Sequence, residues 1–203
     1  MFLNIEFVHW LVILSALISL GGSAVYIRDT LTGKTKPNRV SWFLWAAAPL
    51  LGVGAALSIQ ADPWAVARVF LAGFVPLMIF TASFLNKNSY WKLTRFDIAC
   101  GVIAIFALIL WGFADSPRLA ILFLALADGF AALPTLIKAW RFPETETGIT
   151  YLMSFISVLL IIPSIPAWNI ENSAFPIYLL VVNGALALFV FRKRLFLPAP
   201  SGV

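Results

Sequence analysis

Seven long stretches of this sequence are almost free of charged residues, and they constrain the fold more than any other feature. Each is about 17 to 24 residues long, and they lie at 7–27, 40–61, 69–86, 98–114, 119–137 (interrupted once, by Asp128), 147–170 and 172–191. A helix needs roughly 20 apolar residues to cross a bilayer, whereas a membrane strand needs only about ten. The lengths therefore predict an all-α integral membrane protein with seven transmembrane helices.

The composition agrees with this prediction. Hydrophobic residues make up 62% of the 203 residues and charged residues only 11%, against about a quarter charged in a typical soluble domain. Seven spans with short connections leave no room for a separate soluble domain. The net charge of +5 therefore does not indicate a nucleic-acid-binding surface, which would need a folded soluble face.

Cysteine and histidine are too rare for several kinds of chemistry. Cys100 and His9 are the only residues of their types, which excludes an intrachain disulfide, a thiolate cluster and a His-rich metal site. An intramembrane enzyme would need a second acid, a histidine or a nucleophile and base pair at the depth of Asp128. We find none, so we expect no enzyme activity, no cofactor and no metal.

Lysine and arginine are distributed unevenly between the two sets of connections. The opposite set contains only Arg68 and Arg118. The connections after the first, third and fifth spans and the segment after the last span contain twelve: Arg28, Lys34, Lys36, Arg39, Lys87, Lys92, Arg95, Lys138, Arg141, Arg192, Lys193 and Arg194. Basic residues favour the cytoplasmic side. The sequence thus predicts a multi-pass cell-membrane protein with an outer N-terminus and a cytoplasmic C-terminus.

Asp128 is the one charged residue inside a span. It lies ten residues from Arg118 and ten from Lys138, which is about 15 Å of helix from either end. Asn183 lies at nearly the same depth in the seventh span. Intramembrane acids usually face a cavity or a partner, so the two residues form a candidate solute site, and Asp128 a candidate proton carrier. The alternative is a neutral carboxyl group that only bonds a neighbouring helix.

Two parts of the chain are similar to each other. The segment 19–26 (SLGGSAVY) aligns with 127–134 (ADGFAALP), and 40–44 (VSWFL) aligns with 149–153 (ITYLM). An odd number of helices between two copies keeps them in the same orientation. We therefore expect two parallel three-helix repeats, joined by a linker helix. The expected units are 1–86 (first repeat), 87–116 (linker helix), 117–191 (second repeat) and 192–203 (cytoplasmic basic tail).

The segment 134–155 (PTLIKAWRFPETETGITYLMSF) resembles the proline-glutamine loop of the SWEET, SemiSWEET and wider PQ-loop transporters. Thr135 replaces the glutamine, and the first copy has Tyr26 and Ile27 where the pair would be. The order of three helices, one linker and three helices is also that of SWEET proteins. The resemblance implies a carrier of a small polar solute, with sugars as one candidate class. Such a carrier works by alternating access around a cavity between the two three-helix repeats.

The same resemblance implies roles for individual residues. Pro134 matches a hinge proline in the fifth helix, and Pro49 is placed to match one in the second. Asn183 matches a substrate-binding asparagine of the seventh helix, whereas Ala72 stands at the corresponding place in the third. Trp42 and Trp45 are singled out by their spacing and not by the resemblance, because residues three apart share a helix face. They could stack on a ring-shaped solute or belong to the interfacial aromatic belt.

Two other functions fit the same plan. Carriers of vitamin precursors, of the nicotinamide-riboside type, share the order of helices. Seven-helix sorting receptors also resemble it, but a receptor for a peptide carboxylate would need central basic residues, which the spans do not contain. The expected partners are membrane lipids, a small solute and protons. The sequence leaves open whether the chain forms a homo-oligomer.

Overall fold

The computed structural model describes residues 7–58, 63–165 and 167–196. Within these ranges the regular structure is entirely helical. The α-helices are α1 (Phe7–Leu31), α2 (Arg39–Ser58), α3 (Pro63–Ala82), α4 (Arg95–Gly112), α5 (Pro117–Arg141), α6 (Gly148–Ile161) and α7 (Ile170–Phe196). The predicted all-α fold with seven helices is confirmed.

Four of these helices contain a segment long and apolar enough to cross a membrane. The segments are His9–Leu31, Arg95–Gly112, Pro117–Arg141 and Asn172–Lys193. Two further apolar helical segments, Val69–Ala82 and Gly148–Ser164, are shorter. The length and composition of the helices are therefore those of a protein that places several helices in a bilayer.

Several ends of helices differ from the predicted spans, and those of α6 and α7 change the predicted layout. The sixth span was expected to reach residue 170, but α6 ends at Ile161 and a short 3-10 turn containing Pro163 follows it. Proline has no amide hydrogen to donate, so it ends the helical hydrogen-bond ladder. The seventh helix runs on to Phe196, so the first part of the expected basic tail is its last turn. The rest of that tail lies outside the described residues.

Local signals begin α4 and α5. Thr94 and Asp97 form a capping box, in which each side chain accepts a hydrogen bond from the other residue's backbone amide. The Ser116 side chain accepts a hydrogen bond from the Leu119 amide, and Pro117 is the first residue of α5. The Ser116 cap fixes the start of α5, the helix that carries Asp128.

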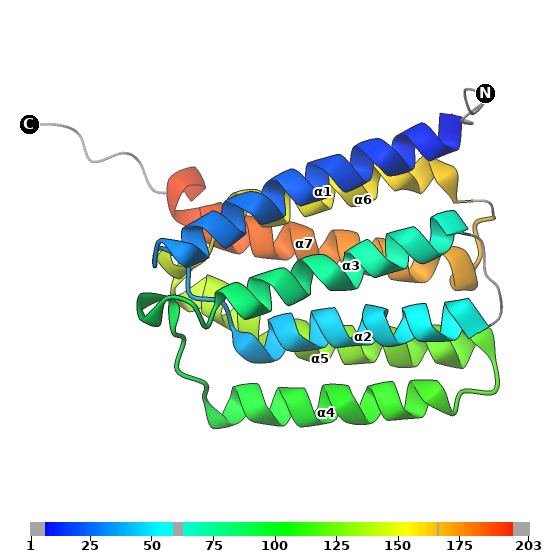
Figure 1. Ribbon diagram of the computed structural model, residues 1–203, viewed down its shortest axis with the longest axis horizontal. Helices are drawn as coiled ribbons and strands as arrows, with labels where there is room; N and C mark the ends of the chain where they lie inside the picture. Colours follow the sequence, from blue (N-terminus) through cyan, green and yellow to red (C-terminus); the bar gives the residue numbers. More distant parts are fainter. Residues whose placement is uncertain (1–6, 59–62, 166, 197–203) are drawn as a thin grey trace, which may run out of the picture.

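The helices run side by side along one axis, with the two termini at opposite ends (Figure 1). Helix α3 packs on both α1 and α2, and α7 packs on both α5 and α6. Between these groups α1 packs on α6 and α2 packs on α5, while α4 lies against α2 and α5. We call the end that carries the α1–α2, α3–α4 and α5–α6 connections the basic end, because twelve of the basic residues lie there.

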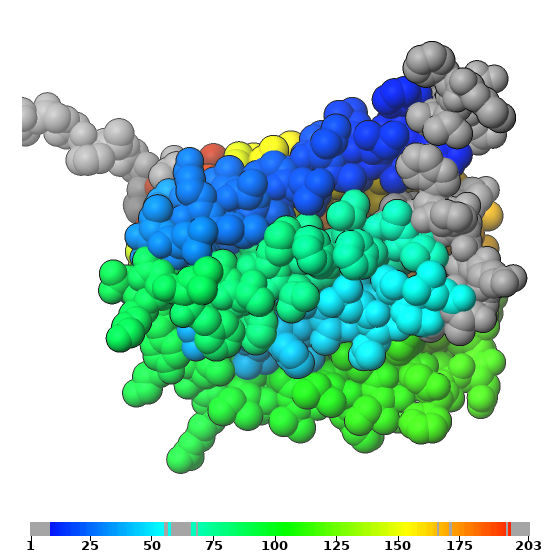
Figure 2. Space-filling view, in the orientation of Figure 1, coloured from blue at the N-terminus to red at the C-terminus, as the bar shows by residue number. Residues whose placement is uncertain are grey.

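The outer surface is apolar. Figure 2 shows one face, on which α1, α3, α2 and α4 lie side by side. On α4 the side chains of Ile98, Val102, Phe106 and Ile109 are 50% to 61% exposed, and their spacing of three or four residues places them on one helical face. An exposed apolar face of this size is typical of contact with lipid or with another protein.

Glycine lets two helices approach closely at Gly73 of α3. A Cβ atom at this position would lie 2.9 Å from the carbonyl oxygen of Ala46 and 3.0 Å from the amide nitrogen of Leu50, both in the backbone of α2. At Gly54, in α2, an added Cβ would meet none of the described atoms within 4 Å. Small residues serve close packing of this kind between membrane helices.

We predict that Gly73→Ala lowers the free energy of unfolding by about 1–3 kcal/mol, because the new methyl group must push α2 away. Gly54→Ala is the matched control. It should leave stability unchanged or raise it by up to about 1 kcal/mol, since alanine is the better helix former. Thermal unfolding of the purified variants in detergent measures both, and equal stability of the two variants would contradict the close approach of α2 and α3.

Candidate functional site

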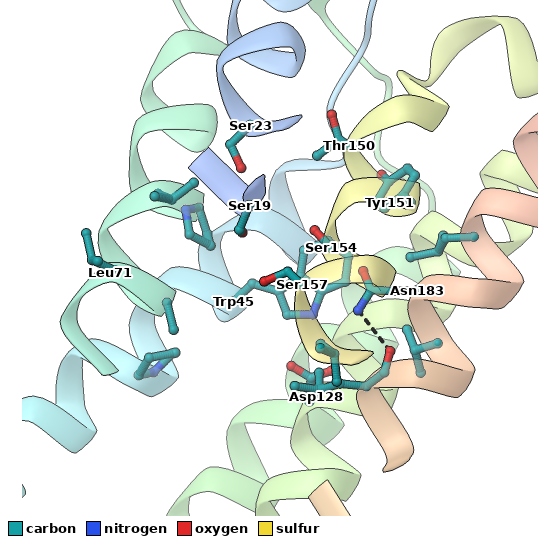
Figure 3. Close-up of a pocket in the computed structure, with 18 of the residues that line it drawn as sticks. Ser19, Ser23, Trp45, Leu71, Asp128, Thr150, Tyr151, Ser154, Ser157 and Asn183 are labelled. Carbon is teal, nitrogen blue, oxygen red and sulfur yellow. Dashed lines mark hydrogen bonds between the residues drawn. The ribbon is translucent and has the colours of Figure 1, made fainter. Parts of the chain in front are cut away.

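A cavity of about 310 Å³ lies between the helices, with walls from α1, α2, α3, α5, α6 and α7. Figure 3 labels ten of its residues, which approach the same space from several of these helices. The structure brings five of the residues singled out in the sequence to this cavity: Trp42, Trp45, Pro49, Asp128 and Asn183. Ala72, at the place where SWEET proteins have an asparagine, also lines it.

Asp128 presents its carboxyl group to the cavity and is held by neutral donors. The Tyr178 hydroxyl of α7 donates a hydrogen bond to Oδ2 of Asp128 at 2.8 Å. The indole of Trp45 is a second side chain that hydrogen-bonds this carboxyl group. Tyr178 was missed in the sequence, although it lies on the same helix as Asn183 and only five residues before it.

Asn183 is oriented by its own helix. Its amide nitrogen donates a hydrogen bond to the carbonyl oxygen of Leu179 at 2.9 Å (Figure 3). That bond uses a donor and leaves the side-chain oxygen as an acceptor. Asn183 and Asp128 therefore give the same cavity two groups that accept hydrogen bonds.

The two tryptophans belong to the interior and not to an interfacial belt. Trp42 is buried, its ring lies edge to face on that of Trp45 at 5.0 Å between centroids, and both line the cavity. The Trp42 indole donates a hydrogen bond to the Tyr26 hydroxyl at 3.2 Å. Belt residues lie on the outer surface, whereas the structure has Trp42 buried and both rings on the cavity wall.

Serine hydroxyl groups complete the polar part of the wall. Ser19, Ser23, Ser154 and Ser157 line the cavity. Ser157 donates to the carbonyl oxygen of Ser15 at 2.8 Å. Within the described part of the chain, the hydroxyl groups of Ser19, Ser23 and Ser154 form no hydrogen bond, so they are available to a bound solute.

A buried ion pair closes the basic end. Nζ of Lys138 lies 2.7 Å from Oε1 of Glu146, and the two side chains are 1% and 0% exposed. Oε2 of Glu146 accepts hydrogen bonds from the hydroxyl groups of Tyr26 and Tyr151, each at 2.8 Å. Lys138 also donates to the backbone oxygens of Lys36 and Thr145. We call Tyr26, Lys138, Glu146 and Tyr151 the basic-end cluster, and it joins α1, α5 and α6.

Hydroxyl contacts reinforce this closure. Thr135, which stands where PQ-loop proteins have glutamine, donates to Oγ of Ser41 at 2.8 Å and so links α5 to α2. Thr35 and Thr147 share a hydrogen bond of 2.5 Å that joins the α1–α2 connection to the α5–α6 connection. All four of these side chains are buried. This network could not be predicted from the sequence, because its members are short polar residues in the connections and near the ends of helices.

The two candidate hinge prolines occupy different surroundings. Pro49 faces the cavity within α2. Pro134 lies within α5, is fully buried, and directly precedes Thr135 at the closed end. Each removes a hydrogen bond from the ladder of its helix, so each marks a place where the helix can bend.

In the portion of the chain that the structure describes, no group of three or more His, Cys, Asp or Glu side chains is arranged to hold a metal ion. Comparison with models of protein families, with curated proteins and with solved structures gives no match for this chain.

The basic-end cluster should contribute strongly to stability. We predict that Glu146→Ala lowers the free energy of unfolding by about 3–5 kcal/mol, because it leaves the Lys138 ammonium buried without a countercharge. Glu144→Ala is the matched control. The Glu144 side chain is 62% exposed and its oxygen lies 3.8 Å from Nζ of Lys193, so its loss should cost at most about 1 kcal/mol.

Denaturation of the two variants in detergent micelles, each compared with the unsubstituted protein, measures this difference. If Glu146→Ala were as stable as Glu144→Ala, the ion pair at the closed end would not be an important constraint on the fold.

Proposed function

We propose that this chain is an integral membrane carrier that moves a small polar solute by alternating access, with the architecture of the SWEET and wider PQ-loop transporters. The observation that carries the proposal is the cavity among six helices, which is closed at the basic end and has Asp128 on its wall. A cavity among transmembrane helices, with an acid at mid-depth, is typical of a solute or proton pathway.

The packing of the helices supports the two parallel repeats. The third helix of each set lies between the first two, since α3 packs on α1 and α2 while α7 packs on α5 and α6. The first helices of the sets, α1 and α5, both have 25 residues. The contacts between the sets are also paired, α1 with α6 and α2 with α5. In this proposal α4 is the linker that keeps the two repeats in the same orientation.

Alternating access then consists of opening one end while the other closes. The basic end is closed by the Lys138 and Glu146 pair and by the Thr135 and Ser41 contact. The solute would therefore enter from the opposite end. Opening the basic end requires the two repeats to separate there, and Pro134 lies within the part of α5 that must move.

The distribution of charge supports the orientation. With the N-terminus outside and the C-terminus in the cytoplasm of a cell, the basic end faces the cytoplasm. In this orientation the cavity, which is closed at the basic end, would be accessible from outside the cell.

Asp128 is proposed as the residue that couples transport to protons. The partners found for its carboxyl group are Tyr178 on α7 and Trp45 on α2, and both are neutral donors. Desolvation favours the protonated form of a carboxyl group that has no countercharge. A group of this kind can take up a proton from one side and release it to the other as the cavity opens to each in turn.

We predict that Asp128→Asn keeps the fold, because an amide oxygen still accepts the Tyr178 hydrogen bond, but abolishes proton movement driven by solute. Proteoliposomes with a trapped pH-sensitive dye measure this when sugars, amino acids and nucleosides are added singly. The unsubstituted protein should move protons with at least one of these solutes, and the variant with none.

Glu144→Gln is the control, since it removes one acidic charge at an exposed position and should behave as the unsubstituted protein does. Proton movement at the full rate in Asp128→Asn would contradict the coupling role and leave Asp128 as a structural contact between helices. The absence of proton movement with every solute in the unsubstituted protein would contradict coupling altogether.

A further inference from the structure

The described wall of the cavity contains an acidic residue and no basic one, and this difference selects among solutes by their charge. The described lining residues come from six helices, and Asp128 is the only charged one among them. Lys138, which is near in sequence, is not in the lining and is paired with Glu146 at the closed end. An ionised Asp128 therefore makes the electrostatic potential inside the cavity negative.

The neutral partners of Asp128 do not cancel that charge. A hydrogen bond from the Tyr178 hydroxyl to Oδ2 stabilises the carboxylate, but it leaves the net charge at minus one. In a site of low effective dielectric constant, an opposite charge within a few ångströms is attracted far more strongly than in water. An anionic solute would be repelled for the same reason.

Aromatic rings line the cavity close to this charge. Trp42 and Trp45 pack edge to face at 5.0 Å, and Phe175 and Tyr151 also line the space. Indole faces attract cations and pack well against flat apolar groups. The wall therefore offers both a surface for a ring and further stabilisation for a positive charge.

Every polar side chain that remains available can accept a hydrogen bond, and the serine hydroxyl groups and the second N–H of Asn183 can also donate one. The second oxygen of Asp128 and the side-chain oxygen of Asn183 accept hydrogen bonds, while the Asn183 nitrogen already donates to Leu179. The hydroxyl groups of Ser19, Ser23 and Ser154 can also accept. An ammonium group supplies three donors and no acceptor, which complements this wall.

From these observations we propose that the cavity binds a small ring-bearing amine in its ammonium form, with the ammonium group on Asp128 and the ring against Trp42 and Trp45. The inference rests on the proposed function, since it assigns a substrate class to the same cavity. The volume of about 310 Å³ lies at the small end of the range for ligand sites, and so suits a ring with a short side chain.

A matched set of three probes tests the charge preference. Benzylamine, benzyl alcohol and benzoate have nearly the same size and shape but are cationic, neutral and anionic at neutral pH. Equilibrium binding to the full-length protein in nanodiscs should be at least about tenfold tighter for benzylamine than for benzyl alcohol, the effect of one charge-assisted hydrogen bond. Benzoate should bind more weakly than benzyl alcohol. Equal binding of benzylamine and benzyl alcohol would overturn the proposal.

Two variants assign the preference to the named residues. Asp128→Asn should remove the tenfold preference for benzylamine over benzyl alcohol, whereas the control Glu144→Gln should keep the preference. Trp45→Leu should weaken both ligands, while Trp168→Leu, at a side chain that is 67% exposed outside the cavity, should weaken neither. A preference that survives Asp128→Asn would overturn the assignment.

Flux measurements separate this inference from the proposed function. Uptake of radiolabelled benzylamine into proteoliposomes is compared with binding by the same preparation. Binding with the expected preference but without uptake would support the ligand class and contradict the carrier. Uptake of a neutral sugar or nucleoside, together with no preference for benzylamine in binding, would support the carrier and overturn the ligand class.

Discussion

The buried ion pair between Lys138 and Glu146 is the interaction on which the closed end of the molecule depends. Moving two charges out of water costs several kcal/mol for each ion, and the pair is stable only if its remaining donors and acceptors are satisfied. Here Glu146 receives two tyrosine hydroxyl groups and Lys138 two backbone oxygens. Those partners come from α1, α6, the α1–α2 connection and the α5–α6 connection. Satisfying one ion pair therefore holds these four parts of the chain together.

The same chemistry suits a gate. If this end opens as proposed for a carrier, water can hydrate the charged and hydroxyl groups that meet in the closed state, so neither state would leave them without partners. An apolar seal of equal size would expose its surface to water on opening. The central cavity differs from the basic end in its charge. Its one described charged residue, Asp128, has only neutral donors as partners and so can interact with a bound solute. In the proposed carrier, the closed end thus supplies structure and the cavity supplies recognition.

Much of this arrangement could be predicted from the sequence, and the exceptions have physical reasons. The spacing of charges gave seven helices, and counting residues from the charged ends placed Asp128 and Asn183 at one depth, where the structure has both on one cavity wall. The inward-facing side of each helix was harder to predict. Helix α2 is apolar all round, and nothing in its sequence shows that Trp42 and Trp45 point inward. The basic-end cluster was missed because Tyr26 and Tyr151 look like apolar span residues, while Lys138 and Glu146 look like solvated connection residues. Only the tertiary contact between α1, α5 and α6 brings them together.

The central claim, that transport requires the basic end to open, is tested most directly by locking that end. The hydroxyl oxygens of Ser41 on α2 and Thr135 on α5 lie 2.8 Å apart, so cysteines at both positions, in a Cys100→Ala background, should form a disulfide bond on oxidation. Exchange of benzylamine or of any transported solute across proteoliposomes should stop when the bond forms and resume on reduction, while each single cysteine variant is unaffected by oxidant. Unchanged exchange in the fully oxidised double variant would contradict alternating access at this end.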